Sequence, residues 1–227
     1  MKRIIQYIKY FFFIAFKWNP LLAFFTLKHE IRGEKKYGLD TSGIDTLKDF
    51  TVTGNKVNAE IYQGANYYLL EEVFTFLRTE NVNTKMIDFG CGKGRVLAVA
   101  AYFGFTDITG IEFAKPLSDA AEINLKNIRR KFPDTHFNIV YEDASVFDIP
   151  VTTKVFFFFN PFNEKVMLQV VKNMLSSVRK YEREIFVVYI NPVHEELFLS
   201  AGFQCVFEVE KMTYISAKIF MLPISEE

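Results

Sequence analysis

Residues 88–94 place one acid directly before three glycines at alternating positions, in the order Asp88, Phe89, Gly90, Cys91, Gly92, Lys93 and Gly94. Apolar residues precede the acid, and an apolar run at 96–103 suits a helix, so the stretch is predicted to be a strand, a tight turn and a helix. Glycines let the backbone adopt positive φ angles and let a ligand approach the main chain without meeting a Cβ atom. This segment is therefore predicted to hold a cofactor.

The spacing of these glycines differs from that of a dinucleotide-binding loop. A G-x-G-x-x-G fingerprint needs its third glycine at position 95, but Arg95 stands there and the glycine comes one residue earlier, at Gly94. The Asp88 carboxylate would also repel a pyrophosphate, whereas S-adenosylmethionine (SAM) carries an ammonium and a sulfonium and no phosphate. The loop therefore favours SAM over a nicotinamide cofactor. An alternative role for Asp88, hydrogen bonding to the loop's own N–H groups, is compatible with the same ligand.

Two more acids follow predicted strands. Glu112 ends a strand 18 residues after Gly94, where its carboxylate can accept hydrogen bonds from both ribose hydroxyls. Asp143 can accept from the adenine amino group while the Ala144 N–H meets a ring nitrogen. Both acids have a purely structural alternative, since Glu112 could be a solvated residue and Asp143 a turn former.

The elements that carry these residues alternate between strands and helices. Strands are expected at 85–89, 107–112, 137–141, 155–159, 184–190, 204–209 and 213–221. Helices are expected at 66–77, 94–103, 117–128, 167–178 and 192–200. Continuously apolar strands predict a mainly parallel sheet covered on both faces, and the last two strands, with no helix between them, predict an antiparallel hairpin. Ligands bind beyond the carboxyl ends of such strands, which is where the three acids and Asn160 lie.

From these residues the chain resembles the class I, Rossmann-like SAM-dependent methyltransferases over about residues 60–227. Residues 88–94 are similar to that family's first motif, 111–112 to its second, and 143–144 to its adenine-contacting motif. The resemblance implies a seven-stranded sheet of order 3-2-1-4-5-7-6, SAM as cofactor, and methyl transfer to an acceptor that the motifs leave open. It implies that the cofactor contacts are Asp88, Gly90, Cys91, Gly92, Gly94, Glu112, Asp143 and Ala144.

Asn160, Pro161 and Phe162 resemble the Asn/Asp-Pro-Pro-Tyr/Phe motif of methyltransferases that modify nitrogens, and are the predicted catalytic residues. An amide oxygen and a backbone carbonyl fixed by proline can accept from an N–H group and so aim its lone pair at the sulfonium methyl. The acceptor would then be a nitrogen of a protein side chain or of a small molecule. This chain has one proline instead of two, so a plain strand-to-helix turn, with Phe162 capping the core, is the alternative.

The first part of the chain is predicted to be a helical extension and linker at 1–55, followed by the methyltransferase domain at 56–227. The opening helix is predicted to have one apolar face and one polar face. The apolar face carries Ile4, Ile8, Phe11, Phe12 and Ala15, and the opposite face carries Lys2, Gln6, Lys9 and Lys17. This amphipathic helix is too short in apolar residues to span a bilayer. It either packs on the domain or on a second copy of the chain, or lies in a membrane interface. Residues 28–36 are expected to be solvated, and 37–55 to be irregular.

Composition narrows the remaining choices. Lys plus Arg and Asp plus Glu both number 27, so no global field draws the protein to nucleic acid. The two distant cysteines and three scattered histidines predict no disulfide framework and no metal site, and fit a cytoplasmic location. The rival from another class is a non-catalytic binding or scaffold module of the same fold, recruited through its N-terminal helix.

Overall fold

A computed structural model describes residues 2–42, 44–46, 61–82, 84–159 and 162–224 of the chain. Its centre is a seven-stranded sheet of β3 (Lys85–Phe89), β4 (Asp107–Glu112), β5 (His136–Tyr141), β6 (Val155–Phe159), β7 (Ile185–Ile190), β8 (Gln204–Lys211) and β9 (Ile215–Leu222). The strand order is β5-β4-β3-β6-β7-β9-β8, and β9 runs antiparallel to both of its neighbours. Counted from β3, this is the order 3-2-1-4-5-7-6, which confirms the predicted sheet.

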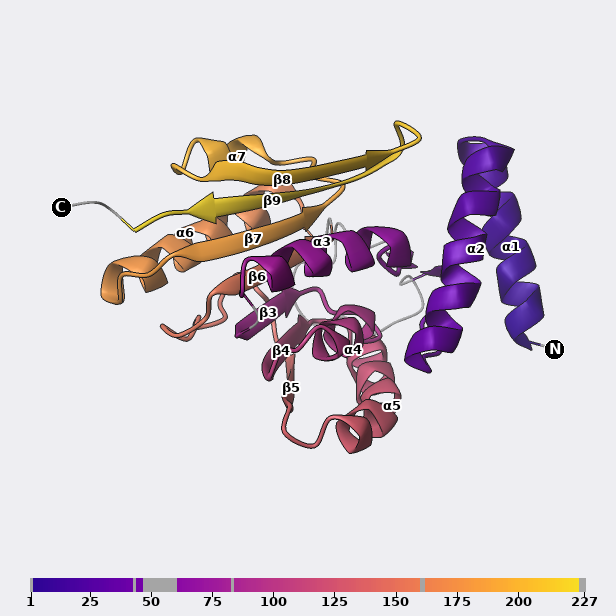
Figure 1. The fold of residues 1–227 in the computed structure, drawn as a ribbon, viewed down its shortest axis with the longest axis horizontal. Coiled ribbons are helices and arrows are strands. Elements are labelled where there is room, and N and C mark those ends of the chain that lie inside the picture. The colour runs from indigo at the N-terminus through magenta and orange to yellow at the C-terminus, as the bar shows by residue number, and fades with distance from the viewer. Residues whose placement is uncertain (1, 43, 47–60, 83, 160–161, 225–227) are drawn as a thin grey trace.

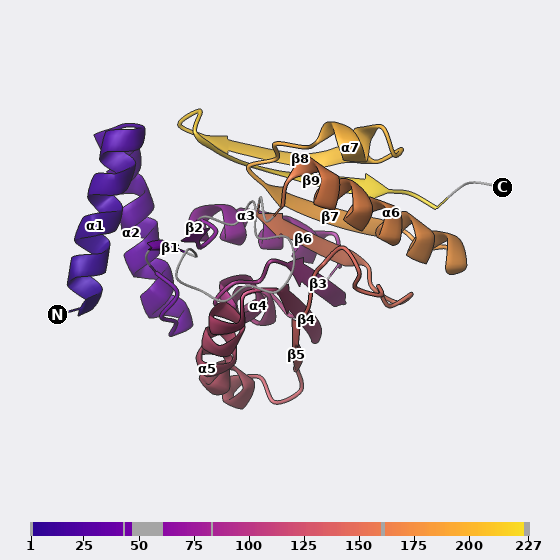
Figure 2. The ribbon, with the colours of Figure 1, turned by 180° about the vertical axis from the view of Figure 1, so that it is seen from behind.

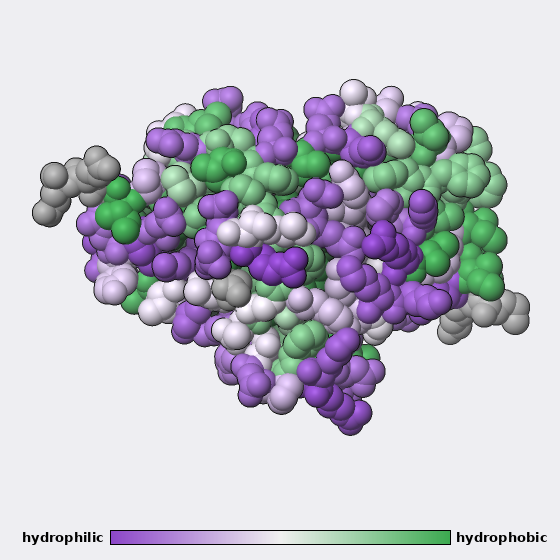
Figure 3. Space-filling model, viewed as in Figure 1, coloured by the Kyte–Doolittle hydropathy of each residue, from purple (hydrophilic) through white to green (hydrophobic). Residues whose placement is uncertain are grey.

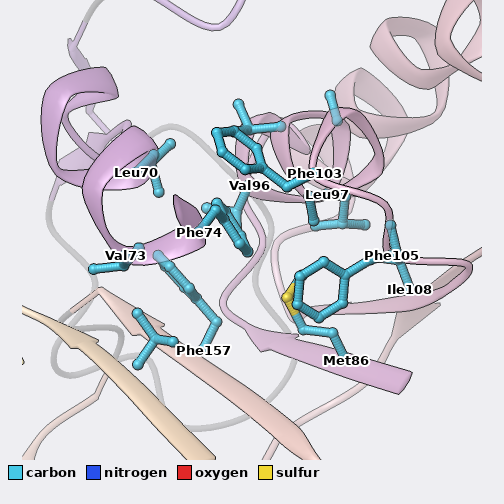
Figure 4. Close-up of a cluster of buried hydrophobic side chains, with 14 of the residues drawn as sticks. Leu70, Val73, Phe74, Met86, Val96, Leu97, Phe103, Phe105, Ile108 and Phe157 are labelled. Carbon is cyan, nitrogen blue, oxygen red and sulfur yellow. The ribbon is translucent and has the colours of Figure 1, made fainter. Parts of the chain in front are cut away.

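Helices cover both faces of this sheet (Figures 1 and 2). One face packs against α3 (Tyr67–Thr79), α4 (Arg95–Tyr102) and α5 (Lys115–Lys131), and the other against α6 (Glu164–Lys180) and α7 (Glu196–Leu199). Burial on both sides explains why β6 is apolar throughout: Phe157 stacks on Phe74 of α3 (Figure 4), whereas Phe156 and Phe158 join the core on the α6 side. Each buried phenylalanine contributes about 1.5–3 kcal/mol to stability.

The N-terminal segment forms a helical hairpin of α1 (Lys2–Lys17) and α2 (Pro20–Tyr37), which lie side by side at one edge of the molecule (Figure 1). Asn19 caps α2, since its Oδ1 accepts from the Leu22 N–H at 2.7 Å, and Gly38 ends it with a φ of 69°. The expectation that residues 28–36 are solvated is wrong for three of them, because Glu30, Gly33 and Glu34 are buried against the domain.

A small antiparallel pair, β1 (Ile44–Thr46) and β2 (Ile61–Gln63), connects the hairpin to α3. The sequence predicted irregular structure at 37–55, whereas 44–46 form a strand and 37 ends a helix. Residues 47–55 of the predicted linker lie outside the described residues. The pair brings β2, and Tyr62 with it, close to the glycine loop that follows β3.

Candidate cofactor site

The glycine loop begins where β3 ends and passes directly into α4. Gly90, Gly92 and Gly94 have φ angles of 78°, 53° and 79°, in the left-handed region that other residues rarely adopt. The N–H groups of Gly90 and Cys91 both donate to the Ile111 carbonyl, at 2.8 and 3.0 Å, which ties the loop to the end of β4. The alternating glycines are therefore required by the turn itself.

Asp88 lies beneath this loop and is 2% exposed. Among the described residues, none donates a hydrogen bond to its Oδ2 atom. Burial, and the nearby charge of Glu112, raise the pKa of Asp88 well above its usual value. A buried carboxylate oxygen without a donor is costly, so the position calls for a cation or a donor from a ligand.

Glu112 ends β4 and is 3% exposed, so the solvated alternative for this residue is wrong. Its Oε2 accepts from the Gly92 N–H at 2.8 Å, and its Oε1 from the Ala114 N–H at 2.9 Å. Burial raises the pKa of Glu112, and these backbone hydrogen bonds oppose that rise. The carboxylate thus holds the loop in place and keeps lone pairs on both oxygens for hydroxyl donors.

Cys91 points away from the loop and into the core. It is 5% exposed, and its Sγ would lie 2.7 Å from a Cβ atom added at Gly110 of β4. Burial, followed by the charges of Asp88 and Glu112, raises the pKa of the Cys91 thiol well above its usual value. The thiol is therefore a packing group, and its backbone is the part of Cys91 that faces the loop.

Asp143 and Ala144 follow β5. Asp143 is half-buried, and its Oδ1 accepts from the Ser145 N–H at 2.8 Å, so it does form the turn that the structural alternative predicted. Ala144 is 5% exposed. The turn uses one oxygen of the carboxylate, and it sets Asp143 two residues beyond Tyr141, the residue of β5 that pairs with Glu112 of β4.

Tyr62, from β2, covers the glycine loop from the side of the N-terminal hairpin. A Cβ atom added at Gly92 would lie 2.3 Å from Cε2 of its ring, and the Lys93 ammonium is 4.9 Å from the ring centre. Tyr62 is 9% exposed. Its packing means that position 92 must be glycine for steric reasons as well as for its φ angle.

Arg95, the residue at the place of the missing third glycine, is the centre of a buried ion cluster that sequence reasoning missed. Its guanidinium pairs with Glu30 at 2.5 Å and Glu34 at 3.5 Å, both from α2, and lies 4.3 Å from the Tyr67 ring centre. It also donates to Thr41 Oγ1 and to the Ala65 carbonyl, each at 2.8 Å. The cluster fastens α2 to the first residue of α4.

The ionised state of Glu34 is held by the same cluster. Burial alone would raise the pKa of Glu34, but Arg95 and hydrogen bonds from Thr41, Tyr67 and Arg3 outweigh it and lower that pKa. Glycines allow the close approach: a Cβ at Gly33 would lie 2.2 Å from the Tyr67 ring, and one at Gly64 would lie 2.5 Å from Arg95 Cζ. The signal available in the sequence was the pair of acids four residues apart beside Gly33.

No protein-family model matches the chain, and no curated protein matches it in sequence. Solved structures match it in fold. A candidate methyltransferase from Escherichia coli has a TM-score of 0.55 at 15% identity, covering 78% of this chain and 99% of its own. A candidate RNA methyltransferase from Pyrococcus horikoshii has a TM-score of 0.53 at 16% identity, covering 78% and 95%. The magnesium protoporphyrin IX methyltransferase of Synechocystis PCC 6803, solved with bound SAM, has a TM-score of 0.52 at 11% identity, covering 70% and 85%.

The chain has the class I methyltransferase fold. Sequence identities this low show that the fold is shared, and a shared fold does not determine the activity, which depends on the residues of the site. In this fold the glycine loop follows β3, Glu112 is the last residue of the adjacent β4, and Asp143 follows the next strand, β5. The strand order reverses between β3 and β6. The predicted cofactor residues are thus gathered at the switch point of the sheet, where open α/β sheets bind ligands.

The predicted catalytic motif follows β6, the neighbour of β3 on the other side. Asn160 and Pro161 lie outside the described residues. Phe162 is half-buried and packs against the core on the α6 side, as its structural alternative predicted. Asn163 caps α6, with its Oδ1 accepting from the Val166 N–H at 3.0 Å, so a strand-to-helix turn begins the helix here.

A cavity of about 100 Å³ lies at the carboxyl ends of β6 and β7, between the sheet and the N-terminal hairpin. The strands and the start of α3 contribute Phe159, Ile190, Asn191, Gln63 and Asn66. The hairpin closes it with Tyr10, Ile14, Trp18, Leu22 and Thr26, and Tyr214, Ile215, Gly64 and Leu69 complete the wall. All of these side chains are uncharged. In the described part of the chain, no three His, Cys, Asp or Glu side chains are grouped so that they could hold a metal ion.

Proposed function

We propose that this protein is a SAM-dependent methyltransferase whose cofactor binds over the glycine loop. The observation that carries the proposal is Asp88: it is a buried acid at the switch point of a methyltransferase fold, and its Oδ2 accepts no hydrogen bond from any described residue. The ammonium group of SAM would supply both the charge and the donors that this carboxylate needs.

The charge of the site agrees with a cationic ligand. Asp88 and Glu112 are both buried, and the charge of Glu112 raises the pKa of Asp88, so the two carboxylates repel one another. A pyrophosphate would add negative charge beside them, whereas an ammonium and a sulfonium would relieve the repulsion. This favours SAM over a dinucleotide, in agreement with the early third glycine.

We assign the remaining contacts by the chemistry of the groups. The free lone pairs of Glu112 would accept from the ribose hydroxyls. The second Asp143 oxygen and the Ala144 N–H would meet the adenine edge. Gly90, Cys91, Gly92 and Gly94 would face the ligand with backbone alone. The domain that performs the reaction is proposed to be residues 56–227, with 1–55 as the extension that closes over it.

Bound SAM would supply a methyl group on a positively charged sulfur. An acceptor lone pair would form the new bond to this methyl carbon, the electron pair of the broken carbon–sulfur bond would stay on sulfur as a neutral thioether, and the acceptor nitrogen would lose its proton to solvent. Asn160 and the Pro161 carbonyl would align an acceptor N–H group for this step, and Phe162 would support it. The uncharged cavity beside Phe159 favours an uncharged acceptor group, about as large as one aromatic ring, from a protein side chain or a small molecule.

Calorimetry with SAM and with NAD tests the cofactor, and binding of NAD in place of SAM would overturn the proposal. Transfer of labelled methyl from SAM into a cell extract tests the reaction and reveals the class of acceptor. The label is expected to be incorporated by the wild-type protein and lost with Asn160→Ala. SAM binding without any incorporation would favour the scaffold module, whose support is the exposed apolar surface of the N-terminal hairpin.

A further inference from the structure

The N-terminal hairpin turns a large apolar surface to the solvent. We call this surface the outer face, and it consists of Ile4, Ile5, Ile8, Phe12 and Phe16 of α1 with Leu21, Phe24 and Ile31 of α2. These side chains are between 44% and 85% exposed. Figure 3 shows the hydrophobic residues gathered at the edge where α1 lies. The inner side of α1 packs through Tyr10 and Ile14, which are 4% and 3% exposed.

The apolar side chains of the two helices are continuous. Phe11 makes edge contacts with Phe12 on its own helix and with Phe24 on α2, at centroid distances of 5.5 and 5.1 Å. Phe12 in turn stacks on Phe16 at 5.9 Å. A connected patch of aromatic and branched side chains on a single domain marks an interaction surface rather than scattered exposure.

Charge on the hairpin distinguishes between the possible occupants. Residues 2–28 contain five cations, Lys2, Arg3, Lys9, Lys17 and Lys28, and no Asp or Glu. Taking those five from the total of 27 leaves 22 cations against 27 acids in the rest of the chain. The whole hairpin, residues 2–37, contains eight cations and two acids, which leaves 19 cations against 25 acids in the rest of the chain, so the net charge of zero conceals a basic hairpin on an acidic domain.

Two of these lysines border the outer face, although the helical pattern predicted them on the side opposite the apolar residues. An open groove on α1 is lined by Ile8, Lys9, Phe12, Phe13, Phe16 and Lys17. Lys9, Lys17 and Lys28 are exposed, and among the described residues none of the three forms an ion pair. Basic side chains next to aromatic and branched ones are the composition of a helix that lies in a lipid headgroup region.

We propose that the outer face docks the protein on an anionic membrane surface, with α1 in the plane of the interface. A second copy of the chain fits this face less well, because it would bring the same lysines and no acid to pair with them. None of the helices that the structure describes is long and apolar enough to cross a membrane. The apolar side chains would enter the acyl boundary while Lys9 and Lys17 meet the phosphates.

Flotation of the full-length protein with lipid vesicles tests this proposal. The protein is expected to float with phosphatidylcholine vesicles that contain phosphatidylglycerol, far less with phosphatidylcholine alone, and less at high salt. Phe16→Glu should lower the partition coefficient at least about tenfold, because a ring that would enter the acyl boundary of the membrane is replaced by a charge. Lys9→Gln and Lys17→Gln should each lower it about fivefold.

Tyr181→Glu is the matched control, since Tyr181 is a 60% exposed aromatic residue at the end of α6, on the side opposite α1 (Figure 1). It should leave vesicle binding unchanged, and thermal unfolding of both variants checks that they fold. Absence of the wild-type protein from anionic vesicles, or equal flotation of Phe16→Glu, would overturn the proposal. A concentration-dependent dimer that Phe16→Glu converts to a monomer would assign the face to a second copy instead. SAM calorimetry is independent of all these outcomes.

Discussion

Replacing Glu30 by glutamine removes one charge from the buried cluster that joins α2 to α4. In the wild-type protein, Oε2 of Glu30 accepts from Arg95 Nη1 at 2.9 Å and Oε1 accepts from Nη2 at 2.5 Å. Both side chains are 3% exposed, so water cannot replace the lost charge. A glutamine keeps one acceptor oxygen but turns an amide donor toward the guanidinium, which leaves Arg95 partly uncompensated.

Removing one partner of a buried ion pair costs about 3–5 kcal/mol. Glu34 remains 3.5 Å from the Arg95 guanidinium and retains part of its charge balance, so we expect the lower end of this range, about 3 kcal/mol. For a chain of this length, each kcal/mol lowers the melting temperature by about 2–4 °C. The Glu30→Gln variant should therefore unfold about 6–12 °C below the wild-type protein.

Urea unfolding and thermal unfolding of the two proteins measure this difference. Glu122→Gln is the matched control, because the Arg129–Glu122 pair has the same separation of 2.5 Å, but its side chains are 36% and 47% exposed. Loss of an exposed pair should cost less than about 1 kcal/mol. If Glu30→Gln and Glu122→Gln lose equal stability, the cluster does not fasten the hairpin and our reasoning about burial is refuted.

Four further predictions concern the cofactor site. Because the pKa of Asp88 is raised in the ligand-free fold, this carboxyl group favours folding at a pH below its usual pKa, and that contribution is lost as the pH rises through the raised pKa. The Asp88→Asn variant should therefore melt at a higher temperature than the wild-type protein at neutral pH. Its melting temperature should also depend less on pH. The same variant should bind SAM at least about tenfold more weakly by calorimetry, and unchanged affinity would contradict the assignment of Asp88. Glu112→Ala leaves two backbone N–H groups without an acceptor and removes the predicted ribose contact, so the SAM affinity and the melting temperature should both fall. A fall in the melting temperature alone would mean that Glu112 has a purely structural role. Gly92→Ala places a Cβ atom 2.3 Å from the Tyr62 ring at a φ of 53°, and should weaken SAM binding by more than Tyr62→Ala does.

Much of the fold could be predicted because local patterns determine it. The apolar runs, the glycine loop after β3 and the missing helix between the last two strands predicted a mainly parallel sheet with a terminal hairpin, and the family resemblance implied the strand order that the structure shows. Parallel strands bring their carboxyl ends to one edge, so strand-end acids that are distant in sequence were expected to meet there. Asp88 and Glu112 are close enough for the charge of one to raise the pKa of the other.

The environment of Arg95 was not predicted from the sequence, where the two acids beside Gly33 were the one available sign of it. Read alone, this residue is a break in a dinucleotide fingerprint, and Glu30 and Glu34 belong to a charged run that should be solvated. Their burial depends on the packing of α2 against α4, which are about 60 residues apart, and on Gly33 and Gly64 admitting the Tyr67 and Arg95 side chains. Contacts over such separations leave no local periodicity in the chain.

The sequence by itself therefore determined the sheet, the glycine turn and the sign of charge at the cofactor site, because these follow from local backbone and residue chemistry. The tertiary structure decided which polar groups are buried and which apolar ones are exposed. It put Glu30 inside the molecule and Phe16 outside it, the reverse of what their polarity suggests. The physical reason is that burial depends on the packing of the whole molecule. Arg95 supplies the charge that permits Glu30 to be buried. Helix α1 is apolar on two sides, but only the side with Tyr10 and Ile14 packs against the rest of the protein, so the side with Phe16 is exposed.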